Sequence, residues 1–274
     1  MVKQNNFSLN GADGKLIIGD ITSDDNGAKK PVILFVHAFK GFKDWGAHNL
    51  VAHHFASNGF CYVKFNLSHS GVPADNPKDV SDLKAFAENT VSKELFDVNA
   101  VLDFIRKTYG DDVEISLIGH SRGGGLSIIE AANDLRIKNL ITWSAIADFS
   151  SLWKKEQEAE WLKTGQIYVT NARTKEQMPL NKTLLEDFKE HAEPLNIINA
   201  AKKINIPWLI VHGDDDVNVP FDVAQTLANA NPGSRLVKIE GANHVYGASH
   251  PYKMESLPPL LFKVCEKCLL FLRE

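Results

Sequence analysis

Residues 113–129 read V-E-I-S-L-I-G-H-S-R-G-G-G-L-S-I-I, and this stretch decides the fold. A short apolar, β-branched run leads into Gly119-His120-Ser121-Arg122-Gly123, and a helical pattern follows at once. The pattern predicts a strand, a sharp turn and a helix, with Ser121 at the apex. The glycines two positions to either side carry no Cβ, so strand and helix can pass close together. A chance G-x-S-x-G in an ordinary turn is the alternative, and the flanking strand and helix argue against it.

The composition of the chain is that of an ordinary globular protein. It has 274 residues, of which 44% are hydrophobic and 23% charged, and a formal net charge of −4. This length suits one large α/β domain with a sizeable core. Because Lys and Arg form no basic stripe, we expect no nucleic-acid partner.

The cellular location is predicted from the lack of long apolar segments and from the number of cysteines. The first residues carry no apolar segment, and no run reaches the roughly 18 residues of a membrane span, so neither a secretory signal nor a span is expected. Three cysteines are typical of a reducing compartment. We therefore expect a cytoplasmic monomer or homodimer with no cofactor. Cys265 and Cys268 share a helical stripe with Leu261 and Leu272, which predicts buried thiols rather than a metal or redox site.

Strands and helices alternate along most of the chain. We expect a hairpin over residues 7–20, polar loops at 24–27 and 72–82, strands at 31–36, 60–65, 113–118, 139–143, 206–211 and 235–240, and helices at 44–58, 91–109, from 121, at 220–231 and at 257–272. This order predicts an α/β fold with a mostly parallel central sheet and helices on both faces.

The alternation breaks between residues 149 and 195. Two charged helical patches, at 154–163 and 184–191, flank a short β-like piece at 167–170. We interpret residues 149–195 as a small helical cap, inserted into a core made of residues 1–148 and 196–274. A set of ordinary surface helices is the alternative.

Two later loops carry side chains that could activate Ser121. A serine hydroxyl is a poor nucleophile at neutral pH and needs a base, which in turn needs an acid to orient it. Asp216 follows the strand at 206–211, and His244 follows the next strand. Loops that leave the carboxyl ends of parallel strands meet at one edge of the sheet. We therefore predict Ser121 as nucleophile, Asp216 as acid and His244 as base.

Other acidic and imidazole side chains remain as alternatives for these roles. Asp148, after the preceding strand, competes with Asp216, and His250 is the second candidate base. We expect His37 and His120 to hydrogen-bond backbone near the turns. His48, His53 and His54 lie on a predicted helix as surface or packing residues.

Four motifs, taken together and in order, resemble the α/β-hydrolase superfamily. They are H-A-F-K-G-F at 37–42, G-H-S-R-G at 119–123, H-G-D-D-D-V-N-V-P at 212–220 and G-A-N-H at 241–244. The resemblance covers nearly the whole chain and is to the serine esterase and dienelactone-hydrolase-like branch, which is related to prolyl-oligopeptidase-type hydrolases. It implies the acid at Asp216. It also implies an oxyanion hole built from the backbone N–H groups of Arg122 and Phe39. Members usually have His-Gly where this chain has His37-Ala38, which puts the aim of the Phe39 N–H in question.

The resemblance implies a serine hydrolase that cleaves small carboxylic esters through an acyl-enzyme. Aromatic side chains near the expected cleft would favour apolar or aryl acyl groups, although packing explains each of them more simply: Trp143, Trp153, Trp161 and Tyr168. An acylaminoacyl- or prolyl-oligopeptidase-like peptidase is the first alternative, although such members usually carry a large extra domain. A non-catalytic binding protein is the second, although such proteins commonly lack one member of the triad.

Overall fold

The structure is a computed structural model, and it describes residues 1–24, 27–77 and 79–274. Residues 25, 26 and 78 belong to the predicted polar loops at 24–27 and 72–82 and lie outside the described part.

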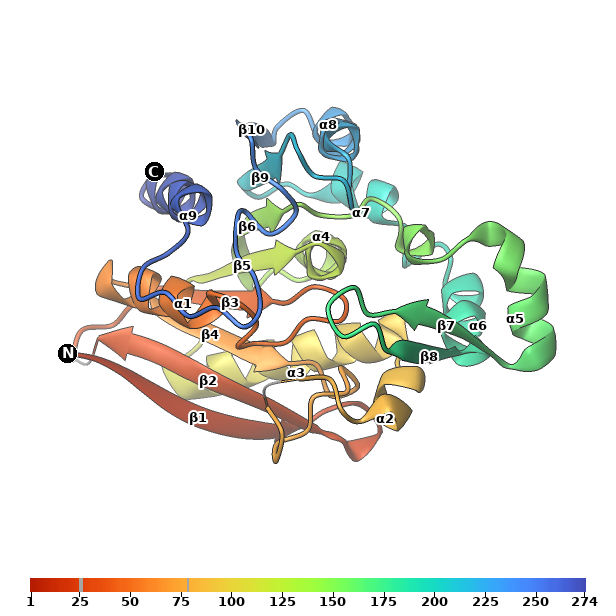
Figure 1. The fold of residues 1–274 in the computed structure, drawn as a ribbon. Helices are drawn as coiled ribbons and strands as arrows, with labels where there is room; N and C mark the ends of the chain where they lie inside the picture. Colours follow the sequence, from red (N-terminus) through yellow and green to blue (C-terminus); the bar gives the residue numbers. More distant parts are fainter. Residues whose placement is uncertain (25–26, 78) are drawn as a thin grey trace.

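A central sheet of eight strands runs through the molecule (Figure 1). Its strand order is β1-β2-β4-β3-β5-β6-β9-β10. These strands are β1 (Val2–Asn10), β2 (Leu16–Asp24), β3 (Val32–Val36), β4 (Cys61–Asn66), β5 (Ile115–His120), β6 (Ile137–Trp143), β9 (Trp208–Gly213) and β10 (Arg235–Ile239). The six strands from β4 to β10 pair in parallel, whereas the β1–β2 hairpin joins the β4 edge in antiparallel fashion. The predicted mostly parallel sheet is confirmed.

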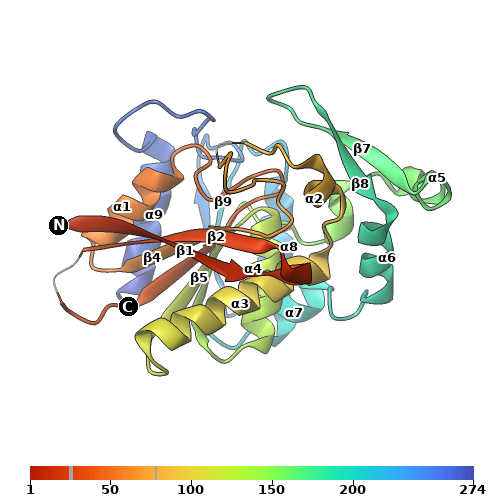
Figure 2. The same ribbon diagram turned by 90° about the horizontal axis from the view of Figure 1, so that it is seen from below.

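Helices cover both faces of this sheet. Figure 2 shows α1 and α9 together on one side, and α3, α4 and α7 on the other. The helices of the sheet layers are α1 (His48–Ser57), α2 (Leu83–Ala87), α3 (Val91–Tyr109), α4 (Arg122–Asn133), α7 (Ile197–Lys203), α8 (Phe221–Ala230) and α9 (Pro259–Leu272). The short helix α2 was not expected, because only five residues and one Asp82 cap define it after the polar loop.

The buried strands feed two separate cores. In β3, Ile33 and Phe35 pack into the core under α1 and α9, whereas Leu34 and Val36 pack into the core under α3 and α4. Side chains of a strand point alternately to the two faces, so a strand covered on both faces must be apolar throughout. Cys265 and Cys268 are fully buried in the α9 core, as the helical stripe predicted.

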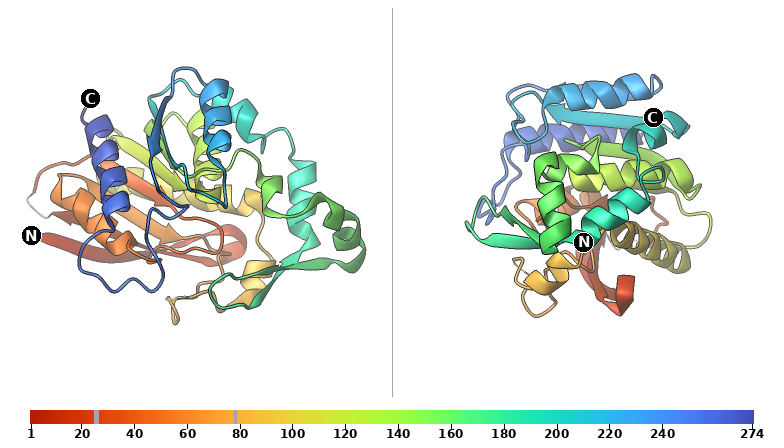
Figure 3. Two further views of the ribbon diagram at one scale, coloured as in Figure 1. Left: turned by 45° about the horizontal axis from the view of Figure 1, so that its top comes forward. Right: turned by 90° about the vertical axis from the view of Figure 1, so that its right-hand side faces the viewer.

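Residues 149–195 stand out at one side of the molecule, beside α2 (Figure 3). This segment contains the short 3-10 helices η2 (Phe149–Leu152) and η3 (Lys155–Gln157), the helices α5 (Glu158–Thr164) and α6 (Lys182–Glu190), and an antiparallel hairpin of β7 (Gln166–Thr170) and β8 (Gln177–Asn181). The sequence predicted a mainly helical insertion with one short β-like piece at 167–170, and the structure adds a second strand that pairs with it. Only the first strand of this hairpin carried a visible β pattern.

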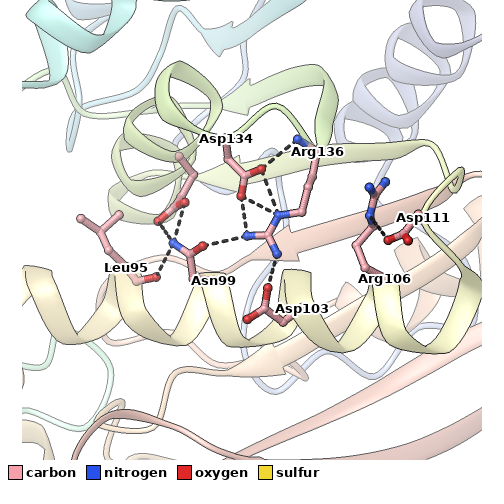
Figure 4. Close-up of polar contacts among 8 residues, drawn as sticks. Leu95, Asn99, Asp103, Arg106, Asp111, Asp134 and Arg136 are labelled. Atoms are coloured by element: carbon pink, nitrogen blue, oxygen red, sulfur yellow. Dashed lines mark hydrogen bonds and ion pairs between the residues drawn. The ribbon is translucent and has the colours of Figure 1, made fainter.

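A polar network joins α3 to the far end of α4 (Figure 4). The Arg136 guanidinium donates to Asp134 at 2.8 Å and to Asn99 at 2.8 Å, and it also pairs with Asp103. Asn99 in turn donates to both oxygens of Glu130, at 3.1 and 3.0 Å. Burial, assisted by the negative charge of Asp134, raises the pKa of Glu130 to about 8, against the opposing effects of Arg136 and Asn99.

Replacement of Glu130 with Gln is expected to stabilise the fold at high pH. A raised pKa in the folded state means that the stability present below pH 4.5 declines as the pH rises towards about 8. Gln keeps an acceptor for Asn99 and removes the buried charge. Urea unfolding should therefore show Glu130→Gln more stable than wild type at pH 9 and nearly equal at pH 4.5. The exposed Glu114→Gln is the control, and a less stable Glu130→Gln at pH 9 would contradict the assignment.

Candidate active site

Ser121 lies in a strained turn between β5 and α4. Its φ of 55° and ψ of −118° are unusual for a residue with a side chain. Such a conformation costs about 1–3 kcal/mol and persists only where surrounding structure enforces it. The Ser121 N–H donates to the Trp143 carbonyl at 2.8 Å, and its own carbonyl accepts from Gly124 and Gly125. The turn therefore places the Ser121 side chain at the carboxyl edge of the sheet, as predicted.

Close approach of backbone explains the glycines on both sides of Ser121. A Cβ on Gly119 would lie 2.3 Å from the Gly123 carbonyl oxygen, and one on Gly123 would lie 2.3 Å from the Val36 carbonyl oxygen. Both contacts involve backbone of neighbouring elements, which cannot move aside. Helix α4 therefore packs against β3 and β5 only because these two positions have no side chain.

Asp216 is a buried carboxylate surrounded by donors. Its Oδ2 accepts from His244 Nδ1 at 2.7 Å and lies 3.5 Å from His212 Nε2, while Oδ1 accepts from the N–H groups of Asn218 and Val219 at 2.9 Å. Burial alone would raise the pKa of Asp216. The hydrogen bonds from His212, His244 and Val219 outweigh burial and hold that pKa well below its usual range. Asp216 is therefore ionised at neutral pH.

His244 lies beside the residue that precedes Ser121. The His244 carbonyl accepts from His120 Nε2 at 2.8 Å, and the two imidazole rings are 5.0 Å apart. The bond to Asp216 engages His244 Nδ1 and leaves Nε2 for another partner. Among the described residues, no hydrogen bond joins Ser121 to His244. The structure thus brings Asp216 and His244 together and sets His244 next to the Ser121 turn.

The β3 loop (residues 37–42) closes a tight turn in front of Arg122. The Ala38 carbonyl accepts from Gly41 N–H and from His37 Nδ1, both at 2.9 Å, and His37 Nε2 accepts from Leu67 N–H at 3.3 Å. Lys40, with a φ of 58°, is the residue of this turn in the left-handed conformation. The φ of Ala38 is not positive, so the backbone does not require a glycine at that position. Burial, together with the Arg122 charge, lowers the pKa of His37 to about 4, and the ring is neutral.

Two backbone N–H groups face no acceptor among the described residues. One belongs to Phe39 in the β3 loop and the other to Arg122, the first residue of α4. The first N–H groups of a helix have no partner within the helix, and the helix dipole favours negative charge there. These are the two N–H groups expected from the sequence to serve as oxyanion donors.

The alternative acid and base make hydrogen bonds of other kinds. Asp148 caps η2, where its oxygens accept from Ser150 N–H at 2.8 Å and from Ser150 Oγ at 2.7 Å. His250 Nδ1 accepts from Gly46 N–H at 3.0 Å, and its ring stacks on Trp45. None of these three hydrogen bonds involves Asp216 or Ser121.

The remaining histidines behave largely as the sequence indicated. His37 and His120 bind backbone carbonyls next to the turns. His48 is buried in the core, His53 is exposed, and His54 pairs with Glu266 on α9. His212 is the functional neighbour that sequence reasoning passed over. Its place at the end of β9, directly before the loop that carries Asp216, could have indicated this role. The ring is fully buried and donates to the Val219 carbonyl in that loop.

The hairpin β7–β8 reaches the β3 loop. Lys40 Nζ donates to the Thr170 carbonyl at 3.1 Å, and Arg173 at the hairpin tip pairs with Asp79 at 2.5 Å. Of the candidate specificity residues, Tyr168 on the hairpin is 55% exposed. The three tryptophans are buried: Trp143, Trp153 and Trp161.

Neither a metal centre nor a membrane span emerges from the described residues. No group of three or more His, Cys, Asp or Glu side chains in the ranges 1–24, 27–77 and 79–274 is arranged to hold a metal ion. Within the same ranges, no helix has the length and apolarity needed to cross a bilayer.

The family model named BD-FAE matches residues 20–230, which contain the Ser121 turn, the β3 loop and Asp216. The chain belongs to the BD-FAE family. It is thus a member of an esterase-like hydrolase family. None of the curated protein sequences matches this one.

Solved structures share the fold of this BD-FAE chain at low identity. Est1E from Butyrivibrio proteoclasticus with bound ferulic acid has a TM-score of 0.70 at 20% identity, over 97% of this chain and 98% of that one. A protein from Klebsiella pneumoniae subsp. pneumoniae, provisionally described as a dienelactone hydrolase, has a TM-score of 0.66 at 14% identity, over 100% and 99%. The acylaminoacyl peptidase of Pyrococcus horikoshii has a TM-score of 0.67 at 17% identity, over 99% of this chain but 41% of that one. The α/β-hydrolase fold is thus confirmed.

Replacement of Gly123 with Ala is expected to destabilise the fold severely. The new methyl group would meet two backbone carbonyl oxygens of the β3 end, at 2.3 and 2.5 Å. Overpacking of this kind costs about 1–3 kcal/mol or more. Thermal unfolding should show a lowered Tm, whereas Gly233→Ala, where the nearest atom is a side-chain oxygen at 3.3 Å, should stay near wild type. Equal Tm values for the two variants would refute the packing argument.

Proposed function

We propose that this protein is a serine carboxylesterase in which Ser121, His244 and Asp216 act as nucleophile, base and acid. The observation that carries the proposal is the 2.7 Å hydrogen bond between Asp216 and His244, at loops that flank the strained Ser121 turn. A buried, ionised carboxylate that fixes the imidazole tautomer is what a serine hydroxyl requires for activation.

The proposed reaction has two halves. Ser121 Oγ attacks the ester carbonyl carbon and gives its proton to His244 Nε2. The carbonyl oxygen becomes an oxyanion that accepts from the N–H groups of Phe39 and Arg122. The alcohol leaves with the proton from His244, so that an acyl group remains on Ser121. Water then attacks this acyl-enzyme with His244 as base, releases the carboxylic acid and restores the serine.

The proposal requires Ser121 and His244 to come within hydrogen-bond reach during the reaction. Catalytic hydrogen bonds are often long or poorly aligned without substrate and tighten in the complex. The proposal therefore calls for rotation of the Ser121 side chain, or a shift of the loop after β10, when substrate binds. Gly241 and Gly247 border that loop with φ values of 69° and 82°, and Gly tolerates such conformations readily.

We also propose that residues 149–195 form a cap beside the site, on a core of residues 1–148 and 196–274. The contact of the hairpin with Lys40 supports this role, because Lys40 directly follows Phe39, which carries one of the proposed oxyanion donors. The pairing of Arg173 with Asp79 also ties the hairpin tip to the core. Tyr168 on the hairpin is exposed, and we propose that it contributes to a preference for apolar or aryl acyl groups. Est1E, which shares the fold, binds ferulic acid, an aryl carboxylic acid.

Replacement of Ser121 with Ala is expected to abolish ester hydrolysis while the protein still folds. Loss of the nucleophile typically lowers kcat by about 10⁶-fold and leaves a residual rate about 10³–10⁴-fold above the uncatalysed reaction. The loss is measured as the rate at which wild type and variant hydrolyse p-nitrophenyl esters of graded acyl length and an ester with an aryl acyl group. Ser150→Ala, at the η2 cap, is the matched control and should keep its activity. Activity that survives in Ser121→Ala would contradict the proposal.

The same panel separates the alternative functions. An acylaminoacyl-peptidase-like enzyme would cleave an acyl-amino-acid anilide faster than the aryl ester. The acylaminoacyl peptidase that shares the fold is more than twice as long as the region it shares with this chain. A non-catalytic binding protein would cleave neither and would fail to react with a fluorophosphonate probe at Ser121.

A further inference from the structure

The side chain of Arg122 has no role in the mechanism above, yet it is almost fully buried. Its exposed fraction is 2%, and that of its partner Glu94 is 4%. Arg122 Nε donates to Glu94 Oε2 at 2.6 Å, and Glu94 Oε1 accepts from Asn89 Nδ2 at 2.7 Å. Nη1 and Nη2 of Arg122 have no hydrogen-bond partner among the described residues.

The guanidinium is directed at aromatic rings rather than at further acceptors. Its carbon Cζ lies 5.2 Å from the centre of the Phe39 ring and 6.0 Å from that of Phe149. The Phe39 ring also stacks on Phe86 of α2, with ring centres 5.5 Å apart. A planar guanidinium interacts favourably with aromatic faces, most strongly where water is excluded.

Stability alone does not account for this arrangement. A buried ion pair often contributes little to the free energy of unfolding, because the cost of removing both charges from water is about as large as their mutual attraction. Two unpaired Nη groups add to that cost. The contact that the guanidinium does make is with Phe39, whose backbone N–H is one of the two proposed oxyanion donors. The other donor is the backbone N–H of Arg122 itself.

Phe39 is thus restrained at both ends. The Ala38 carbonyl is held by Gly41 and His37, and in a trans peptide the Phe39 N–H points opposite to that carbonyl. On the side-chain end, the Phe39 ring rests against Arg122 and Phe86.

We propose that the Arg122 side chain, anchored on Glu94, is a positioning residue that sets the distance between the two oxyanion donors through the Phe39 ring. This inference rests on the proposed esterase function. An oxyanion hole stabilises the transition state only where both donors lie within about 2.7–3.1 Å of the oxyanion, so a small displacement of Phe39 weakens catalysis more than substrate binding.

Three variants test this proposal in the full-length protein. Arg122→Met combined with Glu94→Gln removes both buried charges together, so that no unpaired charge is left to unfold the chain. Phe39→Leu keeps the backbone N–H and both charges but removes the ring. The third variant combines all three substitutions. Arg136→Met, at the opposite end of α4, is the matched control. The measurements are kcat and KM for p-nitrophenyl acetate, the inhibition constant of an aryl boronic acid, and Tm.

The charge-removing pair and Phe39→Leu are each expected to lower kcat by about 10- to 100-fold with KM within about threefold. Inhibition by the boronic acid, whose tetrahedral adduct places an oxygen in the oxyanion hole, should weaken in parallel. The combined variant should lose little more than either alone, because both changes disturb one contact.

Folded variants with kcat near that of wild type, or losses that multiply in the combined variant, would overturn the proposal. If the charge-removing pair fails to fold, Phe39→Leu alone decides by the same kcat and inhibition criteria. A wild-type protein without esterase activity would overturn the proposed function and this inference together. An active wild type with equally active variants would overturn this inference alone.

Discussion

The whole site depends on how closely the start of α4 approaches the carboxyl ends of β3 and β5. Gly119 and Gly123 allow that approach, since a methyl group at either position would meet backbone at 2.3 Å. The approach forces Ser121 into its strained turn and at the same time brings the Arg122 N–H opposite the β3 loop. Strain at Ser121 is thus a consequence of packing that also assembles the donors around it.

Three buried imidazoles then fix the surrounding loops. Each ring donates one N–H to a backbone carbonyl. His37 donates to Ala38 in the β3 loop, His120 donates to His244, and His212 donates to Val219 in the loop that carries Asp216. Burial, together with neighbouring positive or potentially positive groups, holds the pKa of His37 and of His120 below the usual range, so these two rings act as neutral hydrogen-bonding spacers. The negative charge next to His244 lies on one ionised carboxylate, Asp216, which accepts a hydrogen bond from His244 Nδ1.

Much of this arrangement followed from the sequence, because the features involved are local. A G-x-S-x-G motif between an apolar strand and a helix fixes its own geometry, and parallel strands bring the loops at Asp216 and His244 to the same edge. The Arg122–Glu94 pair did not follow. Glu94 lies among the buried positions of α3, and only the docking of α3 against α4 reveals that a charged side chain is buried there. Only the first strand of the β7–β8 hairpin could be predicted. The pairing of Gln166–Thr170 with a second strand depends on residues further along the chain, which show no local β pattern.

The central claim is that an acyl group is carried on Ser121 during turnover, and trapping that intermediate tests it most directly. The protein would be mixed with an aryl ester, quenched in acid within milliseconds, digested and examined by mass spectrometry. The account predicts an acyl adduct on the peptide that contains Ser121 in the wild-type protein, and no adduct in Ser121→Ala. In His244→Ala the adduct should accumulate to a higher level whenever deacylation is slowed more than acylation. Ester turnover with no adduct on that peptide, or with the acyl group on another residue, would contradict it.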